Sequence, residues 1–133
     1  MNRKDTRSPL ARAIGLGSAK SGVEHWWAER ISAIALIPLT LWFIGSIVAH
    51  TGSDYAAFTE WLRRPYVAIL MIALLIALFY HAALGLQVVI EDYQHSWMKL
   101  ATVVATQLGC FILAIAGIVA TLIVTLGADK ALQ

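Results

Sequence analysis

The 133 residues are 59% hydrophobic and only 14% charged, with a formal net charge of +2 and a mean hydropathy of +0.72. Soluble domains are about half apolar and about a quarter charged, so this composition excludes a soluble globular protein and predicts an integral membrane protein. The single cysteine, Cys110, excludes an internal disulfide, a haem attached through C-x-x-C-H and an iron–sulfur cluster held by cysteines. Any redox centre is therefore expected to be bound non-covalently or to sit on a partner.

Three stretches of the chain contain no Asp, Glu, Lys or Arg. They are residues 31–53, 65–90 and 100–128. Each is longer than the roughly 20 apolar residues that cross a bilayer as a helix. We therefore expect an all-α integral membrane protein of one domain, residues 1–133, with transmembrane helices over about 31–50, 66–90 and 100–128. These three spans leave no room for a soluble catalytic module.

The basic residues are unevenly distributed between the two sides of the membrane. With three spans, the N-terminal segment and the second connection share one side. Six Lys or Arg precede residue 31 and Lys99 adds a seventh, whereas the opposite side has three, Arg63, Arg64 and Lys130. The positive-inside rule then predicts a cytoplasmic N-terminus and a periplasmic C-terminus in a bacterial inner membrane, or a matrix N-terminus in the mitochondrial inner membrane.

Residues 1–22 are basic and are interrupted by Pro9, Gly15, Gly17 and Gly22. This pattern indicates an irregular cytoplasmic arm rather than a helix. The composition is compatible with a mitochondrial transit peptide, a segment attracted to anionic lipid, or an arm that docks on a soluble subunit. Composition alone does not choose between these three.

Residues 23–30, VEHWWAER, stand directly before the first span. The tryptophan pair is typical of the aromatic belt at headgroup level, where an isolated histidine or arginine is also common. A role in the aromatic belt and a role in a functional site explain His25 and Arg30 about equally well, and the two roles are compatible. Inside the first span, Pro38 predicts a bend because it removes one backbone hydrogen bond.

The first connection, residues 51–65, carries apolar side chains at helix-like spacing. They are Tyr55, Phe58, Trp61 and Leu62. This spacing predicts a short helix that lies in the outer interface.

The second span contains His81 within an apolar run. Counting about 1.5 Å per residue from Glu91 places it about 15 Å into the membrane, near the midplane, with Gly85 and Asp92 on the same helical face. An ionisable group inside a span is a functional candidate, and a glycine one turn away leaves room for a flat macrocycle such as haem. The alternative is that His81 hydrogen-bonds a neighbouring helix while Gly85 permits close packing. Spacing alone slightly favours this alternative.

A six-coordinate haem iron needs a second axial ligand in addition to His81. His50 lies at the outer end of the first span, and His25 and His95 lie at or beyond the cytoplasmic surface. All three are about 15 Å or more from His81 in depth. The second ligand would therefore come from another subunit.

The second connection, residues 91–99, brings together Asp92, Tyr93, His95 and Trp97. A phenol beside a carboxylate can donate a hydrogen bond to a carbonyl such as that of a quinone, with acid groups supplying protons. Tyr93 and Trp97 as simple belt aromatics explain the pattern at least as well.

Small residues recur in the third span on the four- and eight-residue spacing that lets helices approach closely. They are Ala101, Ala105, Gly109 and Gly117. We expect this stripe to serve packing and no chemistry.

Three features together resemble the SdhD-type hydrophobic membrane anchor subunit of succinate dehydrogenase. They are GVEHWWAER at residues 22–30, His81 followed by Gly85, and Asp92-Tyr93 eleven and twelve residues after the histidine. The N-terminal RSPL and GLGSAK are similar to the alphaproteobacterial branch, which is close to the mitochondrial one. The resemblance covers essentially the whole chain, and the spacing from the histidine to the Asp-Tyr pair is its most specific part.

The resemblance implies one subunit of a four-subunit respiratory complex II, beside a flavoprotein, an iron–sulfur protein and a companion cytochrome b anchor. His81 matches an axial ligand of a haem b shared with that companion, and Tyr93, with Asp92 beside it, matches the quinone-binding tyrosine. Arg30, and less securely His25, match residues near the haem propionates and the quinone pocket. FAD and the iron–sulfur clusters would belong to partner subunits, ubiquinone would be the substrate, and this chain alone would catalyse nothing.

Two other functions remain open at this stage. The chain would serve equally as the anchor of a fumarate reductase, which runs the same machinery in reverse. A small non-redox membrane scaffold or transport protein, from a different class, would use His81 for packing or for a proton relay. Lipid and quinone are expected partners, and nucleic acid is not.

Overall fold

The computed structural model describes residues 20–94 and 97–127. This part of the chain contains helices and no strand, namely α2 (Lys20–Ala49), α3 (Tyr55–Leu62), α4 (Pro65–Tyr93) and α5 (Met98–Thr125). Three of them, α2, α4 and α5, are long and apolar enough to cross a membrane. The expected all-α fold with three transmembrane helices is confirmed.

The helix boundaries differ from the expected spans at the two ends of the chain. α2 already begins at Lys20, inside the segment expected to be an irregular arm, and includes the Trp26–Trp27 belt. The rest of that arm, residues 1–19, lies outside the described residues. α5 ends at Thr125, and Gly127 follows with a φ of 74°, a left-handed conformation that glycine adopts readily after a helix.

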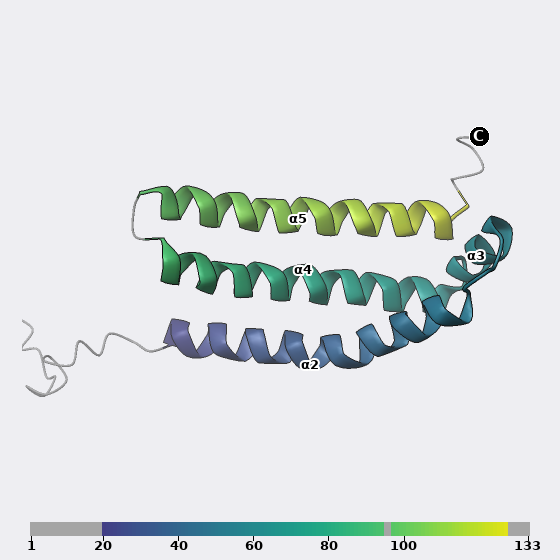
Figure 1. The fold of residues 1–133 in the computed structure, drawn as a ribbon, viewed down its shortest axis with the longest axis horizontal. Helices are drawn as coiled ribbons and strands as arrows, with labels where there is room; N and C mark the ends of the chain where they lie inside the picture. Colours follow the sequence, from purple (N-terminus) through teal and green to yellow (C-terminus); the bar gives the residue numbers. More distant parts are fainter. Residues whose placement is uncertain (1–19, 95–96, 128–133) are drawn as a thin grey trace, which may run out of the picture.

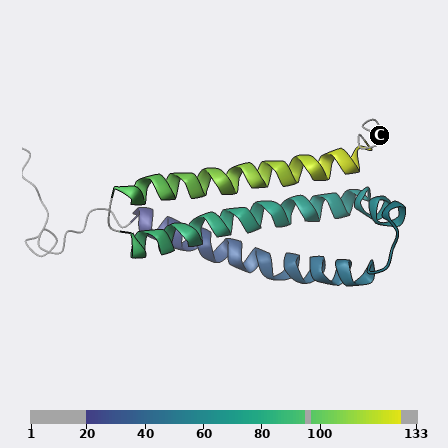
Figure 2. The same cartoon turned by 45° about the horizontal axis from the view of Figure 1, so that its top comes forward.

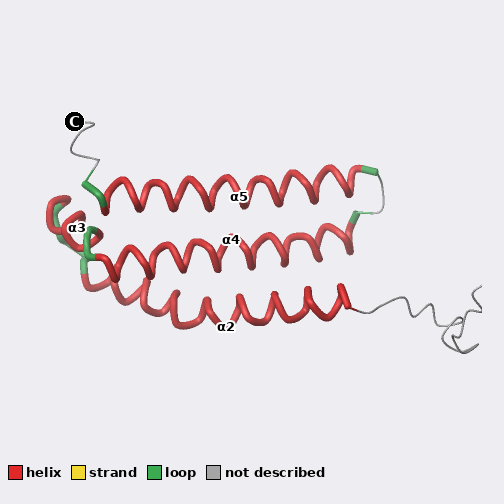
Figure 3. The backbone as a smooth tube through the Cα atoms, turned by 180° about the vertical axis from the view of Figure 1, so that it is seen from behind, coloured by secondary structure: helices red, strands yellow, loops and turns green. Residues whose placement is uncertain are grey.

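The long helices lie side by side with α4 in the middle (Figure 1). α4 packs against both α2 and α5, whereas α2 and α5 share no contact within the described residues. The beginning of α2 and the α4–α5 connection lie at one end of the bundle, and α3 lies at the other (Figures 2 and 3). Contacts between the N-terminal part of α2 and the C-terminal part of α4 are therefore contacts at the end predicted to be cytoplasmic.

α2 continues through Pro38 without interruption. Proline has no backbone N–H, so the carbonyl of Ile34 loses its usual helical partner. Figure 1 shows α2 curving toward its C-terminal end. The expected bend is therefore present.

The predicted short helix in the first connection is confirmed as α3. Asp54 caps it, accepting a hydrogen bond from the backbone N–H of Ala57 at 2.8 Å. The ring of Trp61, 5% exposed, lies against those of His50, Phe58 and Trp42, with centroids 4.6, 5.4 and 6.3 Å away. This aromatic cluster holds α3 against the end of α2.

Two charged residues and a threonine make further contacts at the end of the bundle where α3 lies. Arg63 Nε donates to the carbonyl of Val124 at 3.2 Å, and Thr125 Oγ1 donates to the carbonyl of Leu62 at 3.5 Å. Both bonds tie α3 to the end of α5. Arg64 Nη1 donates to the Tyr66 hydroxyl at 3.3 Å, and this hydrogen bond raises the pKa of Arg64 above its ordinary value.

Few side chains are buried within the chain, and none of them belongs to α5. This is expected in a bilayer, because lipid tails are as apolar as leucine and do not drive apolar side chains inward. The small-residue stripe on α5 makes one close approach. A Cβ at Gly117 would lie 3.1 Å from both δ carbons of Leu75, whereas one at Gly109 would meet nothing within 4 Å. Ala101 and Ala105 are exposed, so most of this stripe does not pack within the chain.

Candidate functional site

His81 lies on α4 beside Ser32 of α2, with its Nδ1 3.0 Å from the Ser32 Oγ. Ser32 is 6% exposed, and its hydroxyl also donates to the carbonyl of Glu29 at 2.9 Å. The hydrogen bond to a neighbouring helix, weighed above as the alternative to a ligand role, is therefore present. It occupies only one of the two ring nitrogens.

The second nitrogen of His81, Nε2, has no hydrogen bond to the described residues. It is also absent from the buried polar atoms that lack a partner, so it reaches the surface of this chain. One turn further along, a Cβ at Gly85 would meet nothing within 4 Å. Gly85 therefore does not serve close packing inside this chain, and the space beside the imidazole is open.

The contact with Ser32 changes the estimated depth of His81. Ser32 is only two residues beyond Arg30, where the apolar stretch of the first span starts. Glu29 and Arg30 thus lie within about one helical turn, about 5.4 Å, of the level of the histidine. His81 therefore lies toward the N-terminal end of that stretch, nearer to charged groups than the count along α4 alone indicated.

His25 lies on the same face of α2 as Ser32, since residues seven apart are about 20° apart around a helix and about 10.5 Å apart along it. The expected separation of 15 Å or more in depth from His81 is therefore too large for His25, although about 10 Å still exceeds the span of one iron centre. Its Nε2 is buried without a hydrogen-bond partner in the described part of the chain. A buried polar atom without a partner costs free energy, and the described residues supply none for this nitrogen.

Arg30 lies on a different face of α2 from Ser32, about 160° away around the helix. Its guanidinium carbon is 4.2 Å from the centroid of the Trp26 ring, a cation–π contact, and the residue is exposed. The structure brings Arg30 level with His81 but not into contact with it.

Tyr93 is the last residue of α4 and is 84% exposed. Asp92 beside it is exposed as well, and neither side chain has a hydrogen bond to the described residues. His95 lies outside the described residues. The phenol and carboxylate are therefore presented at the end of the bundle without being enclosed by this chain.

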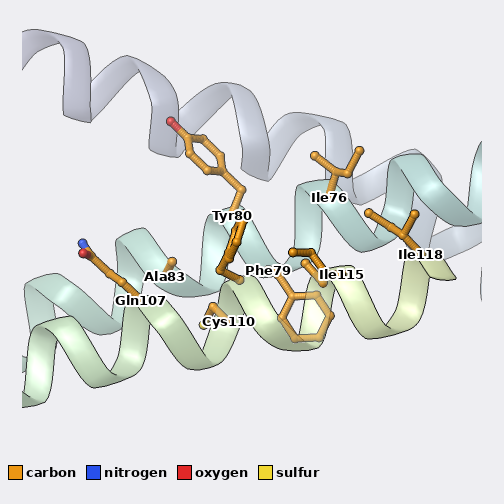
Figure 4. A pocket seen from close by; sticks show the side chains of 10 residues that line it. Ile76, Phe79, Tyr80, Ala83, Gln107, Cys110, Ile115 and Ile118 are labelled. Atoms are coloured by element: carbon orange, nitrogen blue, oxygen red, sulfur yellow. The ribbon is translucent and has the colours of Figure 1, made fainter. Parts of the chain in front are cut away.

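The apolar cavity between α4 and α5, about 330 Å³ in volume, lies elsewhere (Figure 4). Phe79, Cys110 and Ile115 are among its lining residues, and none of the predicted site residues is. Cys110 is half-buried there as a free thiol, in keeping with its expected role as an apolar side chain. Its lining is mainly apolar.

No group of three or more His, Cys, Asp or Glu residues is placed to hold a metal ion in residues 20–94 and 97–127. These residues therefore do not offer three such ligands around His81. Ser32 is the residue that sequence reasoning missed. The sequence feature that could have identified Ser32 is a single hydroxyl side chain at the start of an apolar span. It comes seven residues after His25, so a helical wheel places it on the same face as His25.

Three long apolar helices with few buried side chains among the described residues define the class, a multi-pass helical membrane protein. The chain belongs to the family of succinate dehydrogenase and fumarate reductase transmembrane subunits, which it matches over residues 4–126.

Individual relatives are similar over most of their length. The succinate dehydrogenase hydrophobic membrane anchor subunit of Rickettsia bellii is 43% identical over 89 residues, 67% of this chain and 71% of the relative. The subunit of the same name from Rickettsia conorii is 30% identical over 118 residues, 87% and 94% of the two chains. The Paracoccus denitrificans subunit is 30% identical over 97 residues, 73% and 75%. No solved structure matches the chain.

Proposed function

We propose that the chain is the hydrophobic membrane anchor subunit of a succinate:quinone oxidoreductase, in which His81 ligates a haem b and Tyr93 binds the quinone. Support comes from the family over residues 4–126 and from relatives named as succinate dehydrogenase anchor subunits. Those names favour succinate oxidation over the fumarate reductase alternative, which the family also includes.

One observation carries the haem assignment. The His81 ring has one nitrogen hydrogen-bonded inside the chain and the other at the surface, beside the open space at Gly85. A ligating histidine needs this arrangement, because one nitrogen binds the metal while the other is held by a hydrogen bond. If His81 served only packing, its second nitrogen would not need to stay exposed beside the open space at Gly85.

The remaining residues fit the periphery of a haem. Haem propionates are anions, and the positive guanidinium of Arg30 lies at the level of His81. The unpartnered Nε2 of His25, about 10 Å closer to the cytoplasmic end, would accept or donate a hydrogen bond there. Bound at this place, haem b would supply a one-electron redox centre within reach of the quinone.

At the cytoplasmic end, the Tyr93 hydroxyl would donate a hydrogen bond to a quinone carbonyl, and the carboxylate of Asp92 would exchange protons with the same region. The 84% exposure of Tyr93 requires that other subunits enclose this pocket. We accordingly infer a companion cytochrome b anchor that supplies the second axial ligand, together with iron–sulfur and flavoprotein subunits that deliver electrons from succinate.

The proposed function also predicts the membrane in which the chain lies. A succinate dehydrogenase of alphaproteobacterial type belongs in the bacterial inner membrane, with the basic N-terminal side facing the cytoplasm, or in the mitochondrial inner membrane if the source is eukaryotic. The seven basic residues on the N-terminal side against three opposite support this orientation.

The test compares His81→Gln with His50→Gln in the purified four-subunit complex. His50 is the matched control, because its Nδ1 bonds the Ser46 carbonyl at 2.8 Å at the outer end of α2. We expect the reduced-minus-oxidised spectrum to lose its b-type bands in the first variant and keep them in the second. Unchanged b-type bands in His81→Gln, or their absence from the unmodified complex, would leave the non-redox scaffold as the better function.

A further inference from the structure

We propose that Ser32 is a positioning residue for the haem ligand, fixing both the protonation and the direction of the His81 ring. The inference rests on the proposed function of His81 and adds to it a residue on another helix. It depends on a short chain of two hydrogen bonds, His81 Nδ1 to Ser32 Oγ at 3.0 Å and Ser32 Oγ to the Glu29 carbonyl at 2.9 Å.

The number of hydrogens in this chain determines the tautomer. A serine hydroxyl has one hydrogen and two acceptor lone pairs. A carbonyl oxygen only accepts, so the Ser32 hydrogen is committed to Glu29. The Ser32 oxygen must then accept from His81, which requires the hydrogen of the neutral ring to be on Nδ1. The lone pair is left on Nε2, the atom that reaches the surface and that a haem iron would bind.

Burial makes this selection effective. Ser32 is 6% exposed, so water does not compete for its hydroxyl, and a buried nitrogen left without a hydrogen-bond partner costs free energy. The opposite tautomer would leave Nδ1 as an acceptor facing a hydroxyl whose hydrogen is already engaged. The helix carbonyl of Glu29 is fixed by the backbone, so it acts as an anchor that orients the serine and, through it, the ring.

Two consequences for the metal follow from general coordination chemistry. An N–H that is hydrogen-bonded makes an imidazole a stronger donor, which favours the oxidised metal and lowers its reduction potential. Loss of such an outer partner typically weakens metal binding by about 10–100-fold. Removing the Ser32 hydroxyl should therefore loosen the haem and raise its midpoint potential.

The surroundings of Ser32 permit a matched pair of substitutions. A groove of about 470 Å³ between α2 and α4 adjoins Ser32, and four of its other lining residues are alanines, Ala28, Ala35, Ala73 and Ala77. An extra methyl group fits such a groove. Ser32→Thr then keeps the hydroxyl and Ser32→Val removes it at the same shape, while Ser32→Ala removes it with no added bulk.

The experiment uses the assembled complex and three readouts besides activity. They are the ratio of haem b to flavin, the rate of haem transfer to apomyoglobin, and the haem midpoint potential with the low-spin ferric EPR spectrum. We expect Ser32→Thr to match the unmodified complex. Ser32→Val and Ser32→Ala should lose haem about 10–100-fold faster, with a raised midpoint potential and a shifted EPR spectrum.

Equal behaviour of Ser32→Thr and Ser32→Val, whether both are normal or both are impaired, would overturn the role of the hydroxyl. This result is distinct from failure of the haem assignment. In that case the unmodified complex would lack b-type haem, or His81→Gln would retain it, and the proposal for Ser32 would fall with it.

Discussion

Gln107 of α5 donates a hydrogen bond from its Nε2 to the Oε1 of Gln87 on α4, 2.9 Å away. Gln87 in turn donates from its Nε2 to Glu91 Oε1 at 2.9 Å. Both amides lie in helices that are otherwise apolar enough to span a membrane. They form a polar cross-link between the two helices that carry the second connection, and so steady the end of α4 at which Tyr93 is presented.

The cross-link should contribute modestly to stability. Hydrogen bonds between membrane helices contribute about 0.6 kcal/mol on average and at most about 1.7 kcal/mol. We expect Gln87→Leu and Gln107→Leu each to lower the unfolding free energy of the complex slightly, with a coupling of about 0.6 kcal/mol in a double-mutant cycle. Fully additive effects would show that the two amides do not interact.

A second prediction concerns the closest approach of α4 and α5. A Cβ at Gly117 would lie 3.1 Å from the Leu75 δ carbons, and Gly109 has open space. Gly117→Val should therefore destabilise the complex by roughly 1–3 kcal/mol through overpacking. Gly109→Val, on the same helix, is the control with no such contact. A thermal-unfolding midpoint that Gly117→Val leaves unchanged would contradict the close packing.

A third prediction tests the aromatic cluster at the α3 end of the bundle. Trp61 is 5% exposed and contacts three other rings, so Trp61→Ala should cost about 3–5 kcal/mol of stability. Tyr55 on the same short helix is 68% exposed, and Tyr55→Ala should cost far less. Denaturation of the purified complex in detergent measures both. Similar losses at the two positions would mean that Trp61 is not a packing centre.

The phenol at the end of α4 gives a fourth prediction. Tyr93→Phe would remove the hydrogen-bond donor that we propose for the quinone, and such a bond is worth about 1.4 kcal/mol, or roughly tenfold in the rate of quinone reduction. Succinate oxidation with an artificial dye acceptor should persist, because that reaction does not need the quinone pocket. Tyr55→Phe at the opposite end is the control. Equal loss of both activities in Tyr93→Phe would point to faulty assembly instead.

Much of the architecture follows directly from the sequence. Stretches without charge that exceed the bilayer thickness predict the three long helices, because a helix satisfies its backbone hydrogen bonds within one segment inside lipid. The spacing of Phe58 and Trp61 predicts α3, and Pro38 predicts the curve in α2. The start of α2 at Lys20 was missed, because Gly22 was given more weight as a helix breaker than it has near a helix end.

The site could be predicted only in part, since it depends on contacts between helices. His81 is conspicuous in an apolar run, but its partner Ser32 is 49 residues away and could be assigned only once α2 and α4 were placed side by side. The same contact showed that His81 lies near the level of Arg30, which a count along one helix does not reveal. The Gln87–Gln107 pair was missed because neutral amides do not interrupt an apolar stretch.

The most direct test of the account is chemical rescue of the ligand position. In His81→Gly, the complex should assemble without b-type haem absorbance, and added imidazole should restore it by occupying the space of the missing ring. The account predicts that b-type absorbance recovers in His81→Gly as the imidazole concentration rises. His50→Gly should show no such dependence on imidazole. Full b-type absorbance in His81→Gly without imidazole would contradict the assignment of His81 as the haem ligand.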